Sequence, residues 1–277
     1  MSMKEIAEKI KNADAILIGA SNGLSITEGL HLFANNDTFK ELFGDLQEKY
    51  GIYSILQGMA YRWNTDEEKW GFWSRLIHHY CLEYKPTKVM KDLKAIVGDK
   101  DYFIITSNGE CHFEMSGFSY EKIYEIEGNW LTMQCATPCH DTVYSNVDIM
   151  EKMWKEEKGG KIPSELVPRC PHCGGAMNIH MKFDYRFIRD VGAINRCNEF
   201  LNNCSGKNLV VIELGIGWRN QLIKAPLMRI VAKEDNATYI TVNLGEVYIT
   251  DDIKDKSFGI DGYISDMLDK VRKEMGI

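Results

Sequence analysis

The chain has 277 residues, of which 44% are hydrophobic and 26% charged, and a net charge of -7 at pH 7. This composition is typical of a folded globular protein and excludes extensive disorder, while the acidic surplus argues against a general affinity for nucleic acid, whose phosphates are bound by Lys and Arg. No apolar run is long enough to cross a bilayer and the N-terminus lacks a signal-peptide core, so we expect a cytoplasmic protein without a membrane partner.

The first elements predicted are a helix, a strand and a glycine-broken loop. Residues 2–12 have helical apolar spacing behind Ser2, which can cap them, and Ala15-Ile16-Leu17-Ile18 indicates a buried strand. Thr27 can cap a helix that starts just after it. Between strand and helix lies Gly19-Ala20-Ser21-Asn22-Gly23-Leu24-Ser25, where glycines let backbone N–H groups approach an anion. We predict a pyrophosphate cradle here, with a simple turn as the alternative, since the Gly-x-Gly-x-x-Gly pattern is not met.

Helical spacing dominates residues 38–97. Thr65 and Thr87 can each cap a segment whose apolar residues repeat at helical intervals. Five aromatic residues here could line a ligand pocket, but their spacing favours a packed core. They are Tyr61, Trp63, Trp70, Phe72 and Trp73.

Two further apolar strands run into polar residues. Tyr102-Phe103-Ile104-Ile105 ends at Thr106-Ser107-Asn108, and Ile123-Tyr124-Glu125-Ile126 ends at Glu127-Gly128-Asn129. Ligands of doubly wound α/β sheets bind beyond the carboxyl ends of the strands, so both ends are candidate binding positions.

Eight cysteines in a chain without an export signal point to metal ligation or buried thiols before disulfides. Four of them form two short-spaced pairs, Cys135-x-x-x-Cys139 and Cys170-x-x-Cys173. Each pair supplies two thiolates from one tight turn, so the four predict a closed, structural zinc site with no position left for a catalytic water. The alternative is four free thiols. The remaining cysteines are expected to be ordinary thiols: Cys81, Cys111, Cys197 and Cys204.

The last third of the chain repeats the pattern of a strand followed by glycine. Residues 209–214 run into Gly215-Ile216-Gly217, and residues 239–242 run into Asn243-Leu244-Gly245. A helical stretch over 222–232 is interrupted near its start by Pro226, and the tail from 261 to 274 is again helical. These elements predict an α/β fold with a doubly wound parallel sheet.

The strand ends and the cysteine pairs, in this order, resemble the sirtuin family. Sirtuins have a Gly-Ala-Gly loop after the first strand, a Thr-x-Asn-x-Asp motif, a His-Gly pair, a four-cysteine zinc module, a glycine-bearing strand end and an Asn-containing strand end. The corresponding residues here are Gly19-Ala20-Ser21, Thr106-Ser107-Asn108-Gly109-Glu110, Glu127-Gly128, the four paired cysteines, Gly215-Ile216-Gly217 and Asn243.

The resemblance implies a Rossmann-like NAD-binding domain with an inserted helical module and a small zinc-binding module. We expect residues 1–34, 98–130 and 205–277 to form the NAD-binding domain. Residues 35–97 would then be the helical insertion, and residues 131–204 the zinc module.

Several segments are most similar to the macrodomain-linked sirtuins of microbes, which resemble protein ADP-ribosyltransferases more than deacylases. This branch implies a protein acceptor, with a lipoyl-carrier protein as a candidate, and a macrodomain protein as a partner. The segments are Gly23-Leu24-Ser25 with Gly29, residues 108–118, residues 212–217 and residues 242–246.

Four residues depart from the family pattern. Glu127 stands where deacylases carry a His base and where the macrodomain-linked branch carries a Gln. A carboxylate there could accept a proton from a ribose hydroxyl or hold an acceptor nucleophile. Ser21 replaces a glycine, Glu110 is one methylene longer than Asp, and Lys182 at an Arg position loses planar, bidentate recognition.

The resemblance implies Asn108 and Glu127 as catalytic residues, with Asn108 at the nicotinamide ribose and Glu110 at the nicotinamide amide. The alternatives are a turn residue for Asn108 and solvent-exposed acids for Glu110 and Glu127. Ser25 and Asn243 fit phosphate and adenosine-ribose contacts, and His112 is a minor candidate for the base. The full predicted NAD-binding set is Gly19, Ala20, Ser21, Gly23, Ser25, Asn108, Glu110, Gly215, Gly217 and Asn243.

Three functions follow. The first is an NAD-dependent enzyme that transfers ADP-ribose to a protein, and the second is an NAD-dependent lysine deacylase, disfavoured because no His precedes Gly128. The third is a sensor that binds NAD or ADP-ribose without catalysis, suggested by the combined departures at Ser21, Glu127 and Lys182.

Overall fold

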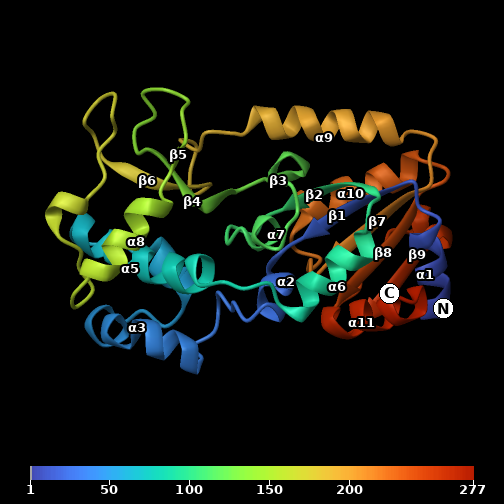
Figure 1. Cartoon of the computed structure of the whole chain (residues 1–277), viewed down its shortest axis with the longest axis horizontal. Helices are drawn as coiled ribbons and strands as arrows, with labels where there is room; N and C mark the ends of the chain where they lie inside the picture. Colours follow the sequence, from blue (N-terminus) through green and yellow to red (C-terminus); the bar gives the residue numbers. More distant parts are fainter. Residues whose placement is uncertain (1) are drawn as a thin grey trace.

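The computed structural model describes residues 2–277, and its largest element is a six-stranded parallel sheet (Figure 1). From one edge to the other, the strands are β3 (Ile123–Glu125), β2 (Asp101–Thr106), β1 (Ala15–Ala20), β7 (Leu209–Leu214), β8 (Thr238–Asn243) and β9 (Ser257–Asp261). The chain thus builds outward from β1 on one side and later from β7 on the other. This order confirms the predicted doubly wound sheet and places its switch point between β1 and β7.

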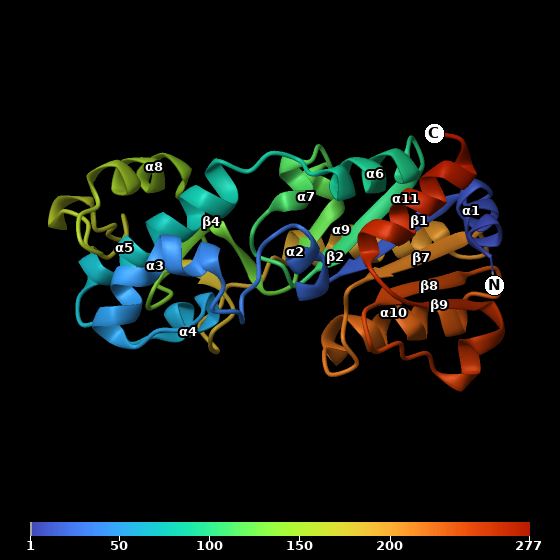
Figure 2. The ribbon, with the colours of Figure 1, turned by 90° about the horizontal axis from the view of Figure 1, so that it is seen from below.

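Helices cover both faces of this sheet (Figure 2). One face packs against α1 (Met3–Lys11), α6 (Lys88–Val97) and α11 (Ile264–Met275) in a single hydrophobic core. The opposite face packs against α9 (Val191–Cys204) and α10 (Gln221–Lys233) in another core. Burial on both faces explains why β1 and β7 are apolar runs without alternation, since every residue of both strands is buried.

A second lobe, at the left of Figures 1 and 2, combines helices with a small antiparallel sheet of order β5-β4-β6. Side chains from both parts share one hydrophobic core. Trp70, Phe72 and Trp73 are buried in it and Tyr61 and Trp63 pack against it, which confirms the prediction of a packed aromatic core. The elements of this lobe are α3 (Asp37–Tyr50), α4 (Ile55–Ala60), α5 (Asp66–Ile77), η1 (His78–Leu82), β4 (Gly128–Cys135), β5 (Tyr144–Ser145), α8 (Val147–Glu156), η3 (Ser164–Leu166) and β6 (Met177–Met181).

Several short helices complete the fold, and the helix starts predicted at Ser2, Thr65 and Thr87 are confirmed. Ser2 accepts a hydrogen bond from the Glu5 backbone, and Thr65 and Thr87 cap α5 and α6 in the same way. No helix within residues 2–277 is long and apolar enough to span a membrane. The short helices are α2 (Asn22–Thr27), α7 (His112–Met115), η2 (Tyr120–Lys122) and η4 (Asp251–Lys256).

Three details of the sequence-based prediction were wrong or incomplete. Thr27 caps no following helix, because it is the last residue of α2 and its hydroxyl donates to the Gly23 carbonyl. Pro226 does not interrupt α10, which is continuous around it. Strands β4, β6 and β9 and helices α8 and α9 were not predicted. Helix α9 lies inside the range predicted for the zinc module, residues 131–204, but packs on the parallel sheet. The predicted boundaries of the three modules stay a prediction.

Candidate active site

The carboxyl ends of five parallel strands meet at one edge of the sheet, and the predicted site residues follow these ends. At the switch point, the Gly23 N–H of α2 donates to the Gly215 carbonyl at 3.0 Å. A Cβ atom on Gly23 would lie 2.5 Å from Gly215 Cα, and Gly215 has a φ of 63°, a region that favours glycine. The two glycines therefore let α2 rest directly on the backbone that follows β7.

Contacts inside the protein account for the neighbouring residues Gly19, Ala20 and Ser21. A Cβ atom on Gly19 would lie 2.3 Å from Leu227 Cδ1 of α10, and Ala20 is fully buried at the end of β1. The Ser21 hydroxyl oxygen accepts hydrogen bonds from Ser107 Oγ and Asn220 Nδ2, at 3.0 Å each. Ser21 thus ties the end of β1 to the segments that follow β2 and precede α10, which a glycine could not do.

Asn108 follows β2 and is buried, with only 6% of its surface exposed. Its backbone N–H donates to Thr106 Oγ1 at 3.0 Å, but its side-chain oxygen and nitrogen have no hydrogen-bond partner within residues 2–277. An ordinary turn residue would keep its amide in water. A buried and unpaired amide is costly unless a ligand or water completes it, so Asn108 has the properties of a binding residue.

Glu110 is also buried, which contradicts the alternative of a solvent-exposed acid. Ser25 Oγ of α2 donates to Glu110 Oε1 at 2.6 Å. Burial raises the pKa of Glu110, and the hydrogen bond from Ser25 works in the opposite direction. Ser25 and Glu110 are thus brought together, although their predicted roles lay at different parts of the dinucleotide.

Glu127 follows β3 and faces a chamber between the two lobes together with Lys182. Burial raises the pKa of the Glu127 carboxyl, while the Lys182 ammonium partly offsets that effect. The backbone N–H of Lys182 donates to the Glu127 carbonyl at 2.9 Å, so the two residues are held side by side. This pair can hold or accept a proton near a bound substrate.

The chamber has a volume of about 350 Å³ and two kinds of wall. Asn108, Glu110, Glu127 and Lys182 form its polar side. The indole N–H of Trp130, which also lines the chamber, is buried and has no hydrogen-bond partner within residues 2–277. It is a second unpaired polar group in the chamber, in addition to the Asn108 amide. The apolar side consists of Leu32, Phe33, Leu56, Met59, Trp130, Met181 and Phe183.

Gly217 and Asn243 lie across the switch point and do not line this chamber. Asn243 Nδ2 donates to the Glu246 carbonyl at 2.9 Å, and a Cβ atom on Gly217 would lie 3.7 Å from Glu246 Oε2. The predicted residues therefore form two groups at the same sheet edge. An extended dinucleotide that crosses the switch point could contact both groups.

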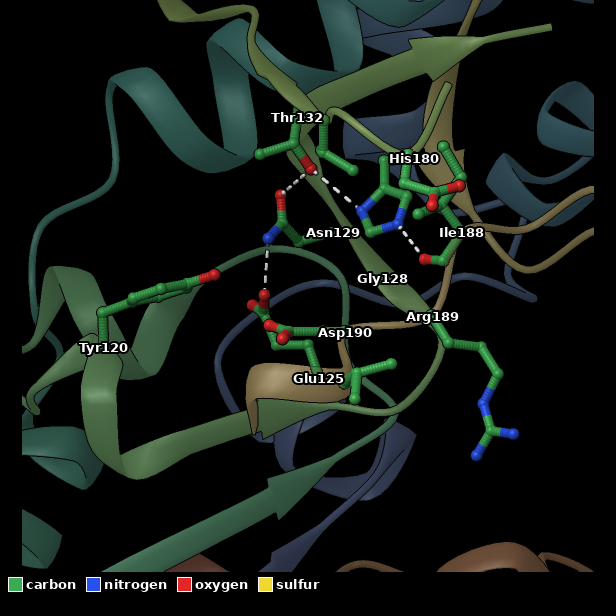
Figure 3. A pocket seen from close by; sticks show the side chains of 12 residues that line it. Tyr120, Glu125, Gly128, Asn129, Thr132, His180, Ile188, Arg189 and Asp190 are labelled. Atoms are coloured by element: carbon green, nitrogen blue, oxygen red, sulfur yellow. Dashed lines mark hydrogen bonds between the residues drawn. The ribbon is translucent and has the colours of Figure 1, made fainter. Parts of the chain in front are cut away.

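Sequence reasoning missed a half-buried acid, Glu125, that lies beside this site. Glu125, the last residue of β3, accepts a hydrogen bond from Asn129 Nδ2 at 2.5 Å, and burial raises its pKa to about 8. Thr132 and His180 continue the hydrogen-bond network in an outer cavity of about 250 Å³ (Figure 3). The only available signal was the acidic Glu125 within a predicted strand of otherwise apolar residues.

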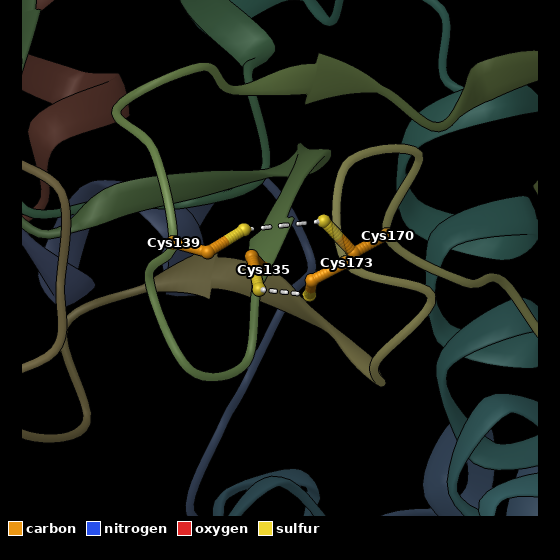
Figure 4. A group of neighbouring side chains, drawn as sticks. All are labelled: Cys135, Cys139, Cys170 and Cys173. Carbon is orange, nitrogen blue, oxygen red and sulfur yellow. Dashed lines mark hydrogen bonds between the residues drawn. The ribbon is translucent and has the colours of Figure 1, made fainter.

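The four paired cysteines converge, as predicted, although they come from segments far apart in the chain (Figure 4). Their sulfur atoms lie within 4.8 Å of one another, and the Cys135–Cys173 and Cys139–Cys170 Sγ distances are both 3.7 Å. Four sulfurs at about 2.3 Å from a tetrahedral zinc are separated by about 3.8 Å, so the cluster fits this ion. All four positions of the ion would be filled by thiolates, which assigns the zinc a structural role.

Comparisons with known proteins place this geometry in context. No family model matches the chain. The protein ADP-ribosyltransferase of Staphylococcus aureus is 30% identical over 264 residues, which cover 94% of this chain and 83% of that protein. A probable bifunctional ADP-ribose hydrolase/ADP-ribosyltransferase of Fusarium oxysporum is 26% identical over 258 residues, which cover 88% of this chain and 42% of that protein.

Solved sirtuin structures have the same fold. One, from work on sirtuin substrate affinity, covers 99% of this chain and 99% of its own, with a TM-score of 0.63 and 19% identity. Sir2Tm bound to a propionylated peptide covers 100% of both chains, with a TM-score of 0.58 and 19% identity. Sir2 with a p53 peptide and NAD⁺ covers 100% of this chain and 99% of its own, with a TM-score of 0.56 and 17% identity.

Proposed function

This chain belongs to the sirtuin family of NAD-dependent enzymes, and we propose that it cleaves the nicotinamide–ribose bond of NAD and transfers ADP-ribose to a protein acceptor. One observation carries the proposal. The buried side-chain amide of Asn108, which has no hydrogen-bond partner within residues 2–277, and the carboxyl of Glu127 line the same chamber. The staphylococcal relative is named a protein ADP-ribosyltransferase, which supports transfer over deacylation.

Bond cleavage leaves an oxocarbenium-like centre on the ribose, and the pyridinium nitrogen takes the bonding electrons as neutral nicotinamide departs. Asn108 would hydrogen-bond the nicotinamide ribose and fix the orientation of the reacting carbon. Glu127 would accept the proton that the acceptor nucleophile loses as it attacks. The apolar chamber wall excludes water that would otherwise hydrolyse the centre.

A lysine deacylase is the second candidate. It is favoured by the sirtuin fold and by the apolar chamber wall, which could hold an acyl chain. Deacylation needs a base for the ribose hydroxyl after the acyl oxygen has attacked, and Glu127 stands where the family's His would be. A sensor without catalysis is the third candidate, because Ser21 and Lys182 depart from the family pattern as well.

The test is nicotinamide release from NAD by the zinc-loaded protein, alone, with a lipoyl-carrier protein and with acyl-lysine peptides. We expect release to require the carrier protein and the carrier to gain the mass of one ADP-ribose. Asn108→Ala and Glu127→Gln should lower the rate by about tenfold to a hundredfold. Glu165→Gln, at an exposed acid in the second lobe, is the matched control. Deacylated peptide as the main product would favour the second candidate, and bound NAD without turnover the third.

The lipoyl-carrier and macrodomain partners are proposed from the resemblance to the macrodomain-linked sirtuins alone. The Fusarium relative is named both an ADP-ribose hydrolase and a transferase, and this chain covers 42% of it. We propose that an ADP-ribose hydrolase of the macrodomain type reverses the modification, as the resemblance to the macrodomain-linked sirtuins implies. Eight cysteines without a disulfide within residues 2–277 suit a reducing compartment such as the cytoplasm.

A further inference from the structure

A small cavity lies beside the chamber, and we call it the inner cavity. It has a volume of about 10 Å³ and is lined by Asn108, Glu110, His112 and Glu125 among others. Asn108 and Glu110 also line the chamber, so the two spaces share a wall. A molecule bound in the inner cavity can therefore contact Asn108 and influence how its side chain is oriented toward the chamber.

His112 presents a fixed hydrogen-bond acceptor to this cavity. Its Nε2 atom lies 2.7 Å from the Tyr80 carbonyl oxygen, and because a carbonyl can only accept, Nε2 carries the proton. Nδ1 is then the bare nitrogen. Burial lowers the pKa of His112, which keeps the ring neutral, and the ring stacks on Tyr84 with centroids 3.7 Å apart and planes at 11°. The ring cannot turn away without losing both contacts.

Three buried polar atoms on this wall have no partner within residues 2–277. They are Nδ1 of His112 and the side-chain oxygen and nitrogen of Asn108. The exposed fractions of the two residues are 5% and 6%, so bulk water does not reach them. Buried polar atoms are almost always hydrogen-bonded, and a cavity of about 10 to 15 Å³ is the smallest that holds one water molecule. The volume and the chemistry of the inner cavity both match a single water.

We propose that the inner cavity binds one ordered water molecule that accepts a hydrogen bond from Asn108 Nδ2 and donates one to His112 Nδ1. Nδ1 can only accept, so the water donates one O–H to it, and the water oxygen keeps a lone pair that can accept from Asn108 Nδ2. The Asn108 amide nitrogen then faces the cavity and its carbonyl oxygen faces the chamber, ready to accept from a substrate hydroxyl. His112 is a positioning residue that acts through Asn108. Its effect on turnover rests on the proposed function, whereas the water site itself does not.

Two variants separate the two nitrogens of His112. In His112→Gln the amide reaches the Nε2 position and can keep the bond to the Tyr80 carbonyl, but it removes the acceptor at Nδ1. In His112→Asn the side-chain oxygen takes the Nδ1 position and keeps the acceptor, but the bond to Tyr80 is lost. A purely structural role for His112 predicts that Asn is the worse substitution. The proposal predicts the opposite order for turnover.

The experiment combines a high-resolution crystal structure of the zinc-loaded wild-type protein with nicotinamide-release kinetics and melting temperatures of both variants. We expect a water within hydrogen-bond distance of both Asn108 and His112 Nδ1, and a kcat about tenfold lower in His112→Gln than in His112→Asn, with similar KM values for NAD. A cavity without ordered density overturns the proposal even if the protein proves inactive. Equal kcat values in the two folded variants, or a lower value for Asn, would also overturn it and leave the proposed function intact.

Discussion

At the scale of single residues, the fold changes the protonation state of Glu125 near the site. Its carboxyl lies at the end of β3, and Asn129 Nδ2 donates to it. Burial raises its pKa from an ordinary 4.5 to about 8. The acid groups Glu110 and Glu114 add to the shift, and the outer cavity brings further titratable neighbours. These are Tyr120, Asp141, His180, Arg189 and Asp190.

This shift predicts a pH-dependent stability cost. Between pH 4.5 and pH 8 the unfolded chain has an ionised Glu125 while the folded chain keeps the proton, so the folded state binds more protons. The free energy of unfolding should therefore fall as pH rises through this window, by at most about 1.4 kcal/mol for each unit of pH. Glu125→Gln keeps the Asn129 contact and removes the ionisation. We expect its stability relative to wild type to increase between pH 5 and pH 8, measured by urea unfolding.

The exposed Glu165→Gln variant makes the same Glu-to-Gln substitution at a surface position and is the control, for which we expect no comparable gain over the wild type between pH 5 and pH 8. Parallel curves for Glu125→Gln and wild type would show that Glu125 titrates normally.

At the scale of single residues, the sequence predicted which residues lie at the site, but it did not predict the hydrogen bonds that these residues make. Asn108 and Glu110 were found because each follows a strand end at the right edge of a parallel sheet, and both prove to be buried there. The contacts of Ser25 with Glu110 and of Ser21 with Asn220 join residues far apart in the chain, and no local pattern encodes them. Glu125 was missed because desolvation depends on the tertiary surroundings of a side chain.

Among the elements, α2 is placed by its contact with the backbone after β7. Gly23 touches Gly215, and a Cβ atom at position 23 would meet main-chain atoms that cannot move aside cheaply. Gly23→Ala should therefore push α2 away from the switch point. We expect a loss of about 1 to 3 kcal/mol in the free energy of unfolding, with a higher KM for NAD because Ser25 moves with α2. Urea unfolding and nicotinamide-release kinetics measure the two effects.

Gly44→Ala is the matched control, because Gly44 is also in a helix and a Cβ atom there meets nothing within 4 Å. Alanine is the better helix former, so this variant should be neutral or more stable by up to about 1 kcal/mol. If Gly23→Ala behaves like Gly44→Ala, the close contact between α2 and β7 does not exist.

The element-scale predictions succeeded where local signals were strong. Apolar runs such as residues 209–214 are buried on both faces, and Ser2, Thr65 and Thr87 are local caps, so one stretch of sequence suffices for each. Strand β4 contains Asn129, Thr132 and Gln134 among its apolar residues, and its pairing with β6 shifts register between Gly128 and Met133. Its pattern is therefore neither alternating nor continuously apolar, and only the pairing across the small sheet defines it as a strand.

On the scale of the whole molecule, the chamber depends on both lobes. Asn108 comes from the parallel sheet, whereas Trp130 belongs to β4 and Lys182 follows β6. Strands β4 and β6 pair next to the four cysteines, since Cys135 ends β4 and pairs with Met177 of β6. The metal site therefore supports one wall of the chamber without touching the substrate.

Removal of zinc should consequently lower both stability and turnover. We expect the zinc-free protein, verified by metal analysis, to melt about 10 °C lower and to release nicotinamide at least about tenfold more slowly, because the β4–β6 wall loosens.

Cysteine substitutions test zinc ligation directly. Cys173 is exposed, so Cys173→Ser costs almost nothing unless its sulfur holds a metal, whereas Cys197 is a buried thiol with ordinary packing. A larger loss of melting temperature in Cys173→Ser than in Cys197→Ser would follow from zinc ligation, and the reverse order would mean that the four cysteines are free thiols.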